Sequence, residues 1–231
     1  MKKKLVVLTG AGMSAESGIS TFRDSGGLWE NYRVEDVATP EGFARNPELV
    51  LNFYNQRRRE LLSTHPNAGH IGLAELEKDF DVRIITQNVD NLHERAGSTH
   101  VIHLHGELMK SCSVRDLNTP YAIDPEHPDL HLGDLAPDGR QLRPFIVWFG
   151  EPVPMIDPAI REVEDSDIFV IIGTSLNVYP AAGLLNYVRR GQPIYLIDPK
   201  EVHTYRTDIE HLQYGASEGV RKLTEKLMAL R

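Results

Sequence analysis

Residues 5–23 read LVVLTGAGMSAESGISTFR, and this stretch decides the fold. It begins with an apolar run of the kind that a buried parallel strand needs. Gly10, Ala11 and Gly12 follow at once. Glycine lets the backbone turn sharply and lets a phosphate approach closely, and the N–H groups of such a turn hold anions well. The stretch predicts a dinucleotide at the carboxyl end of the first strand, although a turn of this kind also forms for packing alone.

The composition narrows the class of protein. The chain has 231 residues, 25 basic and 33 acidic side chains and a net charge of −8. We expect no nucleic-acid partner, because a sequence-independent grip needs a basic face. Cys112 is the single cysteine, which excludes an internal disulfide. No apolar run approaches the ~18 residues that span a bilayer, so no membrane association is expected. The start MKKKLVVLTG has too short an apolar run for a signal peptide, and we expect a cytoplasmic protein.

Further apolar runs alternate with helical patterns along the chain. Strands are expected at 82–86, 146–149, 168–172 and 194–197. Helices are expected over 68–79, 91–96, 158–165, 181–190 and 218–230. This alternation predicts an α/β fold with a Rossmann-like, doubly wound, mostly parallel sheet.

Two segments break the alternation. Residues 30–64 look mainly helical, with Pro40 and Pro47 as breakers, and residues 110–144 are irregular and rich in Asp, Pro, His and Gly. We expect one domain over residues 1–231, in which these two insertions build a smaller subdomain. A long irregular stretch in a compact domain is usually functional or a small module. For residues 115–140 alone, a mobile surface loop is an equal alternative.

Four polar motifs follow the opening stretch, each near the end of an expected strand, where open α/β sheets bind ligands. They read TQNVD at 86–90, VIHLHGE at 101–107, VWFGE at 147–151 and GTSLNVYP at 173–180. Together with the opening GAGMSAESGI and TFR, this set resembles the sirtuins, the NAD-consuming protein deacylases. The resemblance covers nearly the whole chain except residues 112–142. It implies that NAD is bound and consumed as a co-substrate.

The resemblance implies an NAD site at the strand ends. Side-chain amides at Gln87 and Asn88 can both donate and accept hydrogen bonds, and Asn88 and Asp90 are expected at the nicotinamide–ribose end. Asp198 stands where many sirtuins carry Asn. Caps and turns account for Asn, Asp and Ser at such positions equally well. The expected cofactor-binding residues are Gly10, Ala11, Gly12, Ser14, Ala15, Gly18, Ile19, Phe22, Arg23, Gln87, Asn88, Asp90, Gly173, Thr174, Ser175, Asn177 and Asp198.

Histidine titrates near neutral pH, so a histidine at this site can act as a general base. His103 and His105 stand two residues apart, and on a strand both would point to the same side. Spacing alone therefore does not choose between them. The resemblance to the sirtuin His-Gly pair assigns the base to His105.

The substrate side is also expected from the resemblance. Val147, Phe149 and Gly150 resemble the stretch that pairs with the substrate backbone and lines the acyl-lysine tunnel, although the aromatic rings could equally be core. Tyr54 and Arg57 share a helix face at i, i+3 and resemble the pair that reads a distal carboxylate in sirtuins that remove malonyl, succinyl or glutaryl groups. Ala38 resembles the small residue that widens their tunnel. The bland alternative is a solvated run of arginines over residues 57–59.

Many sirtuins carry two cysteine pairs that bind a structural zinc. Here only Cys112 remains, so we expect no metal and read residues 110–144 as a metal-free replacement. His127 and His131 have i, i+4 spacing, but their flanking prolines make a metal site improbable. The expected function is NAD-dependent deacylation of acylated lysines in proteins, giving nicotinamide and O-acyl-ADP-ribose. The alternatives are a mono-ADP-ribosyltransferase on the same scaffold and a non-enzymatic NAD or ADP-ribose sensor.

Overall fold

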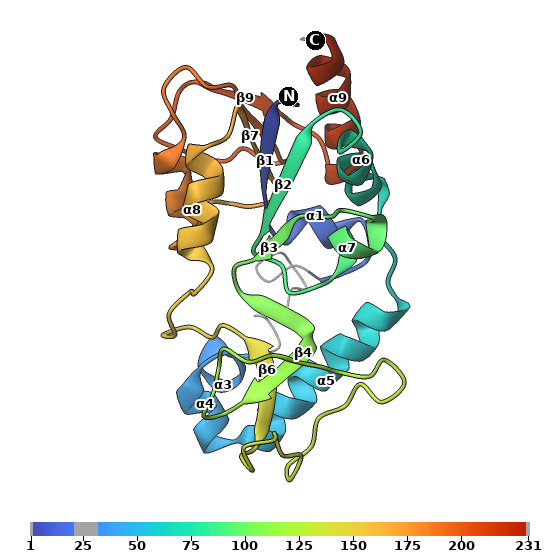
Figure 1. The fold of residues 1–231 in the computed structure, drawn as a ribbon, viewed down its shortest axis with the longest axis vertical. Coiled ribbons are helices and arrows are strands. Elements are labelled where there is room, and N and C mark those ends of the chain that lie inside the picture. Colours follow the sequence, from blue (N-terminus) through green and yellow to red (C-terminus); the bar gives the residue numbers. More distant parts are fainter. Residues whose placement is uncertain (1, 21–31, 230–231) are drawn as a thin grey trace.

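The opening strand lies inside a six-stranded parallel sheet in a computed structural model of the chain, which describes residues 2–20 and 32–229 (Figure 1). The order of the strands is β3-β2-β1-β7-β8-β9. Their bounds are Lys4–Thr9 for β1, Asp81–Thr86 for β2, Val101–His103 for β3, Ile168–Ile172 for β7, Ile194–Ile197 for β8 and Ile209–Leu212 for β9. The chain leaves β1 toward β2 on one side, and β7 pairs with β1 on the other. This reversal is the switch point at which such sheets bind ligands.

Helices cover both faces of this sheet because successive residues of β1 point to opposite sides. Leu5 and Val7 pack in one cluster with α6 (Ala68–Leu76) and α9 (Ala216–Ala229). Val6 and Leu8 pack in another with α8 (Ile156–Glu164) and the 3₁₀ helix Ala181–Tyr187. The expected doubly wound α/β fold is therefore confirmed.

The glycine turns after β1 and β7 pack directly against each other. The Gly12 N–H donates to the Gly173 carbonyl over 2.9 Å, and a Cβ on Gly12 would lie 2.6 Å from the Gly173 Cα. Gly173 itself has φ +62, and a Cβ there would lie 2.4 Å from the Met13 nitrogen. Glycine is required at these two positions because no side chain fits between the two backbones. Helix α1 (Gly12–Ala15) begins at this contact.

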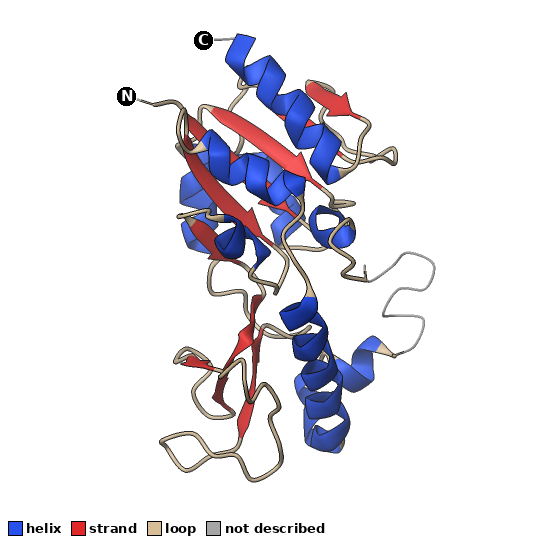
Figure 2. Cartoon of the chain, turned by 90° about the vertical axis from the view of Figure 1, so that its right-hand side faces the viewer, coloured by secondary structure: helices blue, strands red, loops and turns tan. Residues whose placement is uncertain are grey.

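A smaller lobe lies beyond the carboxyl ends of the large sheet (Figures 1 and 2). It contains α3 (Val34–Val37), α4 (Pro40–Arg45), α5 (Pro47–Ser63) and a three-stranded antiparallel sheet. That sheet has the order β5-β4-β6, with bounds Tyr121–Ala122, Gly106–Ser113 and Leu142–Ile146. Helix α5 contacts β4 and β6, so the two segments that break the sequence pattern pack together.

Proline starts the helices of the small lobe. Pro40 and Pro47 stand at the first positions of α4 and α5, where the missing N–H costs nothing. The Thr39 hydroxyl accepts from the Gly42 N–H over 2.9 Å, and the side-chain Oδ1 of Asn46 accepts from the Leu49 N–H over 3.1 Å. These caps explain why two helices meet end to end over residues 40–63.

Three expected elements differ from the structure. The expected strand at 146–149 is wrong, because β6 ends at Ile146, residues 147 and 148 are irregular, and residues 149 and 150 belong to a turn. The expected helix at 181–190 is a 3₁₀ helix that ends at Tyr187. The expected helix at 68–79 ends as an α-helix at Leu76, whereas α7 (Leu92–Ala96) matches its expected range closely.

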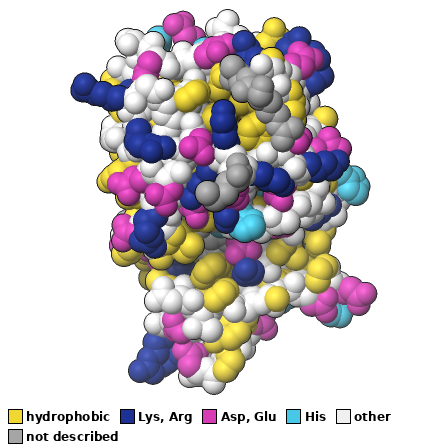
Figure 3. Space-filling view, turned by 45° about the horizontal axis from the view of Figure 1, so that its top comes forward, with side chains coloured by type: hydrophobic (Ala, Val, Ile, Leu, Met, Phe, Trp, Pro, Cys, Tyr) yellow, Lys and Arg dark blue, Asp and Glu magenta, His cyan; other side chains and the backbone are white. Residues whose placement is uncertain are grey.

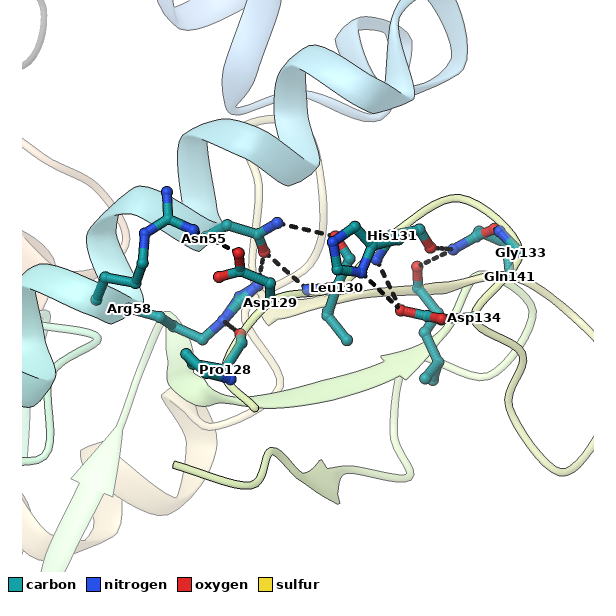
Figure 4. A network of polar contacts seen from close by, with 11 residues as sticks. Asn55, Arg58, Pro128, Asp129, Leu130, His131, Gly133, Asp134 and Gln141 are labelled. Carbon is teal, nitrogen blue, oxygen red and sulfur yellow. Dashed lines mark hydrogen bonds and ion pairs between the residues drawn. The ribbon is translucent and has the colours of Figure 1, made fainter. Parts of the chain in front are cut away.

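Side chains of α5 hold the irregular segment 128–141 in place (Figure 4). The Asn55 side chain exchanges two hydrogen bonds with the Leu130 backbone, each of 2.9 Å. Arg58 donates from Nε to the Pro128 carbonyl over 2.7 Å and from Nη2 to the Asn55 Oδ1 over 2.6 Å. Arg58 is 0% exposed, and burial lowers its pKa to about 10. Residues 128–130 are therefore tied to the helix at several points rather than lying loose on the surface.

Cys112 lies buried in β4 with no disulfide partner, and burial raises the pKa of its thiol to about 11. Within residues 2–20 and 32–229, no three His, Cys, Asp or Glu side chains gather as a metal site would require. The absence of zinc stays a prediction.

Over the same described residues, no helix is both long and apolar enough to cross a bilayer. Figure 3 shows acidic and basic side chains interspersed over one face of the molecule.

Candidate active site

One cavity of about 670 Å³ lies at the carboxyl ends of the parallel strands, where the two lobes meet. Its walls come from the turns after β1, β2, β7 and β8 and from α5 and the loop after β6. The cavity is lined by these predicted site residues: Ala11, Gly12, Ala15, Ala38, Tyr54, Arg57, Gln87, Asn88, His105, Val147, Phe149, Gly150, Gly173, Thr174, Ser175, Asn177 and Asp198. The structure thus gathers predicted cofactor, base and substrate residues from distant parts of the sequence into one space.

Some predicted cofactor residues do not line this cavity. They are Gly10, Ser14, Gly18, Ile19 and Asp90. Phe22 and Arg23 lie outside the described residues. Gly10 has a packing role instead, because a Cβ there would lie 2.7 Å from the Gly173 carbonyl oxygen. The alternative that part of the glycine turn serves packing therefore has support at Gly10.

A buried network behind the cavity fixes Asn88. Its Nδ2 donates to the Gly10 carbonyl over 3.0 Å and to the Ser14 Oγ over 3.2 Å. Ser14 in turn donates to the Asp90 Oδ2 over 2.9 Å. Both hydrogens of the Asn88 amide are therefore committed, and Asn88 offers its Oδ1 as an acceptor to a hydroxyl in the cavity. Ser14 contacts Asn88 directly and Asp90 contacts Ser14, and neither residue lines the cavity wall.

The His105 ring is oriented by the end of β2. Its Nδ1 lies 3.1 Å from the Gln87 carbonyl oxygen. A carbonyl only accepts, so Nδ1 carries the hydrogen and Nε2 keeps its lone pair. Burial lowers the pKa of His105, with the Gln87 carbonyl acting in the opposite direction. His105 is therefore a neutral imidazole at neutral pH, with Nε2 as its basic atom.

His103 is held differently and lies outside the cavity lining. Its Nδ1 lies 3.2 Å from the Asn88 carbonyl oxygen, and its Nε2 lies 2.7 Å from the Glu94 Oε1. Burial disfavours its charge, but the hydrogen bond and charge of Glu94 outweigh burial and raise the pKa of His103. With both ring nitrogens committed, His103 has no free basic atom, and the structure separates two histidines that spacing could not.

The end of the cavity where the substrate residues were expected is formed by α5 and by the turn after α3. Tyr54 and Arg57 are both buried and both face this space from α5. Arg57 is 8% exposed, which contradicts a solvated run, although the side chain of Arg59 is 53% exposed. The Arg57 Cζ lies 5.7 Å from the centre of the Phe53 ring. A cation and a hydroxyl thus stand together at an otherwise apolar wall.

The loop after β6 commits its backbone donors within the protein. The Val147 N–H donates to the His105 carbonyl over 3.0 Å, and the Phe149 N–H donates to the Ala38 carbonyl over 3.0 Å. The Trp148 N–H donates to the Glu151 Oε2 over 2.8 Å. A substrate backbone can therefore pair only with other groups of residues 147–150. The Phe149 side chain is 49% exposed, as a residue at the mouth of a cavity would be.

The opposite end of the cavity carries polar groups. The Gln87 Nε2 donates to the Thr174 Oγ1 over 3.1 Å, and the Asp198 Oδ1 accepts from the Lys200 N–H over 2.9 Å. Backbone N–H groups, amides, hydroxyls and a carboxylate such as that of Asp198 are the groups that the phosphates, riboses and carboxamide of NAD require. The residues present therefore fit NAD.

Sequence reasoning missed several residues of the cavity. Lys200 and His203 follow Asp198 in an irregular stretch with no motif to mark it. Trp148 belongs to the stretch that resembles the substrate-pairing segment but was not among the expected site residues, because strand alternation would place it on the face opposite Val147 and Phe149. It nevertheless lines the cavity. The VWFGE motif marks this part of the site, but the strand expected over it is absent, because β6 ends at Ile146.

A family model described as Sir2 family matches residues 10–180, which is more than half of the chain. The chain belongs to the Sir2 family, the sirtuins. A relative from Bacteroides thetaiotaomicron, named NAD-dependent protein deacylase, is 66% identical over 230 residues, with 98% of this chain and 98% of that protein covered.

Solved sirtuin structures share this fold. A mutant Sir2 homologue in complex with ADP-ribose superposes with a TM-score of 0.89 at 41% identity, covering 100% of this chain and 95% of that chain. A Sir2 homologue in complex with NAD gives a TM-score of 0.86 at 42% identity, covering 99% of this chain and 91% of that chain. The sirtuin resemblance and the fold expected from it are confirmed.

Proposed function

We propose that this sirtuin is an NAD-dependent protein lysine deacylase that releases nicotinamide and O-acyl-ADP-ribose. The observation that carries the proposal is the single cavity that joins the polar strand ends, the His105 imidazole and the buried pair on α5. NAD, as co-substrate, supplies the ribose that takes over the acyl group. The names of the relatives and the complexes of the solved homologues with NAD and ADP-ribose support this function.

Each part of the site has a task in this reaction. Asn88 offers an acceptor oxygen to a ribose hydroxyl, and its own position is fixed by Gly10 and Ser14. His105 takes a proton at Nε2 from a ribose hydroxyl, while Nδ1 keeps its hydrogen on the Gln87 carbonyl. The apolar side chains of Phe53, Val147 and Trp148 give the acyl chain an apolar wall. No part of this scheme needs a metal, and we propose that residues 1–231 act as one metal-free catalytic domain.

For the acyl group, we propose a preference for acidic acyl chains such as succinyl and malonyl. Arg57 is a buried guanidinium at the wall of the cavity, and a guanidinium stays charged in proteins and can hold a carboxylate bidentately. Tyr54 adds a hydroxyl one turn away on the same face of α5. Ala38 leaves room beside them. We also propose a cytoplasmic location, since a lone cysteine without a disulfide partner fits a reducing compartment.

The experiment is a panel of acetyl-, malonyl- and succinyl-lysine peptides with NAD, read by nicotinamide release. Hydrogen bonds to charged groups contribute roughly 1.5–3 kcal/mol, or about one to two powers of ten in affinity. Arg57→Met should therefore raise the KM for succinyl-lysine by about tenfold or more and change that for acetyl-lysine far less. Arg59→Met is the matched control, because Arg59 belongs to the same arginine run but pairs with Asp129 at the surface. If Arg57→Met changes all acyl groups alike, the acidic preference is wrong while deacylation stands.

A further inference from the structure

Trp148 is held rigidly beside the substrate end of the cavity. It is 2% exposed, and the Arg143 Cζ lies 3.4 Å from the centre of its ring. Arg143 donates to the Glu151 carboxylate at 2.6 and 3.0 Å, and the same carboxylate accepts the Trp148 backbone N–H. The indole is thus fixed through its face and its backbone. A ring held in this way presents its Nε1–H in one direction.

The Trp148 Nε1–H points at the Tyr54 hydroxyl. The Trp148 Nε1 lies 3.0 Å from the Tyr54 oxygen. An indole nitrogen only donates, so the Tyr54 oxygen accepts and its own hydrogen must turn away from Trp148. Among the described residues, no acceptor is found for this hydrogen. Burial raises the pKa of Tyr54 to about 12, so the hydroxyl keeps its hydrogen at neutral and mildly alkaline pH.

We propose that Trp148 is a positioning residue for acyl recognition, whose indole N–H turns the Tyr54 hydroxyl into a dedicated donor toward the acyl group. Tyr54 lines the same cavity as Arg57, so its hydrogen and the guanidinium address one acceptor-bearing acyl end. The proposal rests on the proposed deacylase function for the identity of its ligand, an acyl chain that ends in a carboxylate. If the residue at 148 had no N–H donor, the Tyr54 hydroxyl hydrogen would be free to point toward residue 148 as well as toward the acyl group.

A spectrum of the protein without substrate tests the hydrogen bond itself. The chain has two tryptophans, Trp29 and Trp148, so a ¹H–¹⁵N spectrum shows two indole signals. Trp148→Phe identifies the Trp148 signal by removing it. In Tyr54→Phe, which leaves Trp148 intact, that signal should move upfield because its acceptor is lost. An unmoved signal overturns the proposal, whatever acyl group the enzyme prefers.

A double-mutant cycle tests the role in specificity. A neutral hydrogen bond contributes enough to change affinity by about 3- to 10-fold. The ratio of kcat/KM for succinyl-lysine over acetyl-lysine should fall by that factor in Trp148→Phe and in Tyr54→Phe, and no further in the double variant. Phe43→Leu is the control for packing. The Phe43 ring packs 5.3 Å from the indole, but it has no N–H group that could donate to the Tyr54 hydroxyl.

The outcomes separate the two proposals. A wild-type ratio that does not favour succinyl-lysine contradicts the acidic preference, and the indole signal still decides whether Trp148 holds Tyr54. With a wild-type preference present, additive losses in the double variant overturn the positioning role. An equal fall in Phe43→Leu also overturns it, because loss of packing would then explain the effect.

Discussion

At the scale of single residues, two histidines near the same strand end have opposite environments. Burial lowers the pKa of His105 below its ordinary value, although the Gln87 carbonyl acts in the opposite direction. The Glu94 carboxylate raises the pKa of His103 above its ordinary value. A base works only when it is deprotonated, so a lowered pKa extends activity toward acid. We predict that kcat/KM for an acyl peptide rises with pH through an apparent pKa below about 6.5 and is level by pH 7.

This pH profile is measured by initial rates between pH 5 and 9 at low peptide concentration. Glu94→Gln is the control, because it removes the partner of His103 without touching His105. The acid limb should stay in place in that variant. If the acid limb of the pH profile shifts in Glu94→Gln, the general base is His103 rather than His105.

Most residues that a backbone turn or a polar motif marked as site candidates line the cavity. The sequence could not choose between His103 and His105 by spacing, because the choice depends on Gln87 and Glu94, which come from other elements. It also could not assign Arg57 and Arg58 to different partners. Three adjacent arginines look like a solvated face, and only contacts with residues some 70 positions away bury Arg58.

At the scale of elements, two faces of α5 make different contacts. Tyr54 and Arg57 face the cavity, while Asn55 and Arg58 hold the segment around Leu130. We predict that Asn55→Ala lowers the free energy of unfolding by about 2–3 kcal/mol, because buried backbone groups of Leu130 then lose their partners. Denaturant titration measures this loss. Gln56→Ala is the matched control on the exposed face, where we expect the free energy of unfolding to change by no more than about 0.5 kcal/mol. Equal effects of the two variants would contradict a stabilising role for the Asn55–Leu130 hydrogen bonds.

Four strands of the large sheet, β1, β2, β7 and β8, could be predicted because buried parallel strands are mostly apolar, as Ile168–Ile172 is. The edge strands β3 and β9 were not predicted, because they are short and only partly buried. The backbone at 147–150 could not be predicted, because only Trp148 is buried there, for a reason other than sheet pairing, while Phe149 is exposed. Trp148 packs under Arg143, and the Glu151 carboxylate takes the backbone N–H that a strand partner would need. A local side-chain acceptor of this kind competes with sheet pairing.

At the scale of the whole molecule, the small lobe is held by packing and hydrogen bonds in the region where many sirtuins bind zinc. We predict well under one zinc per chain by elemental analysis and an unchanged Tm in a chelator. The reason is that Cys112 alone, with a thiol pKa of about 11, supplies no thiolate cluster. Stoichiometric zinc that is lost together with the fold on chelation would contradict this.

The central claim is that one cavity transfers an acyl group from lysine to the ribose of NAD with His105 as base. Mass spectrometry of the products formed from a succinyl-lysine peptide and NAD tests it most directly. The account predicts free lysine peptide, nicotinamide and O-succinyl-ADP-ribose in equal amounts, and at least ~10²-fold slower formation in His105→Ala, a usual scale for loss of a general base. ADP-ribose attached to the peptide or to the protein, or NAD bound without nicotinamide release, would contradict the account.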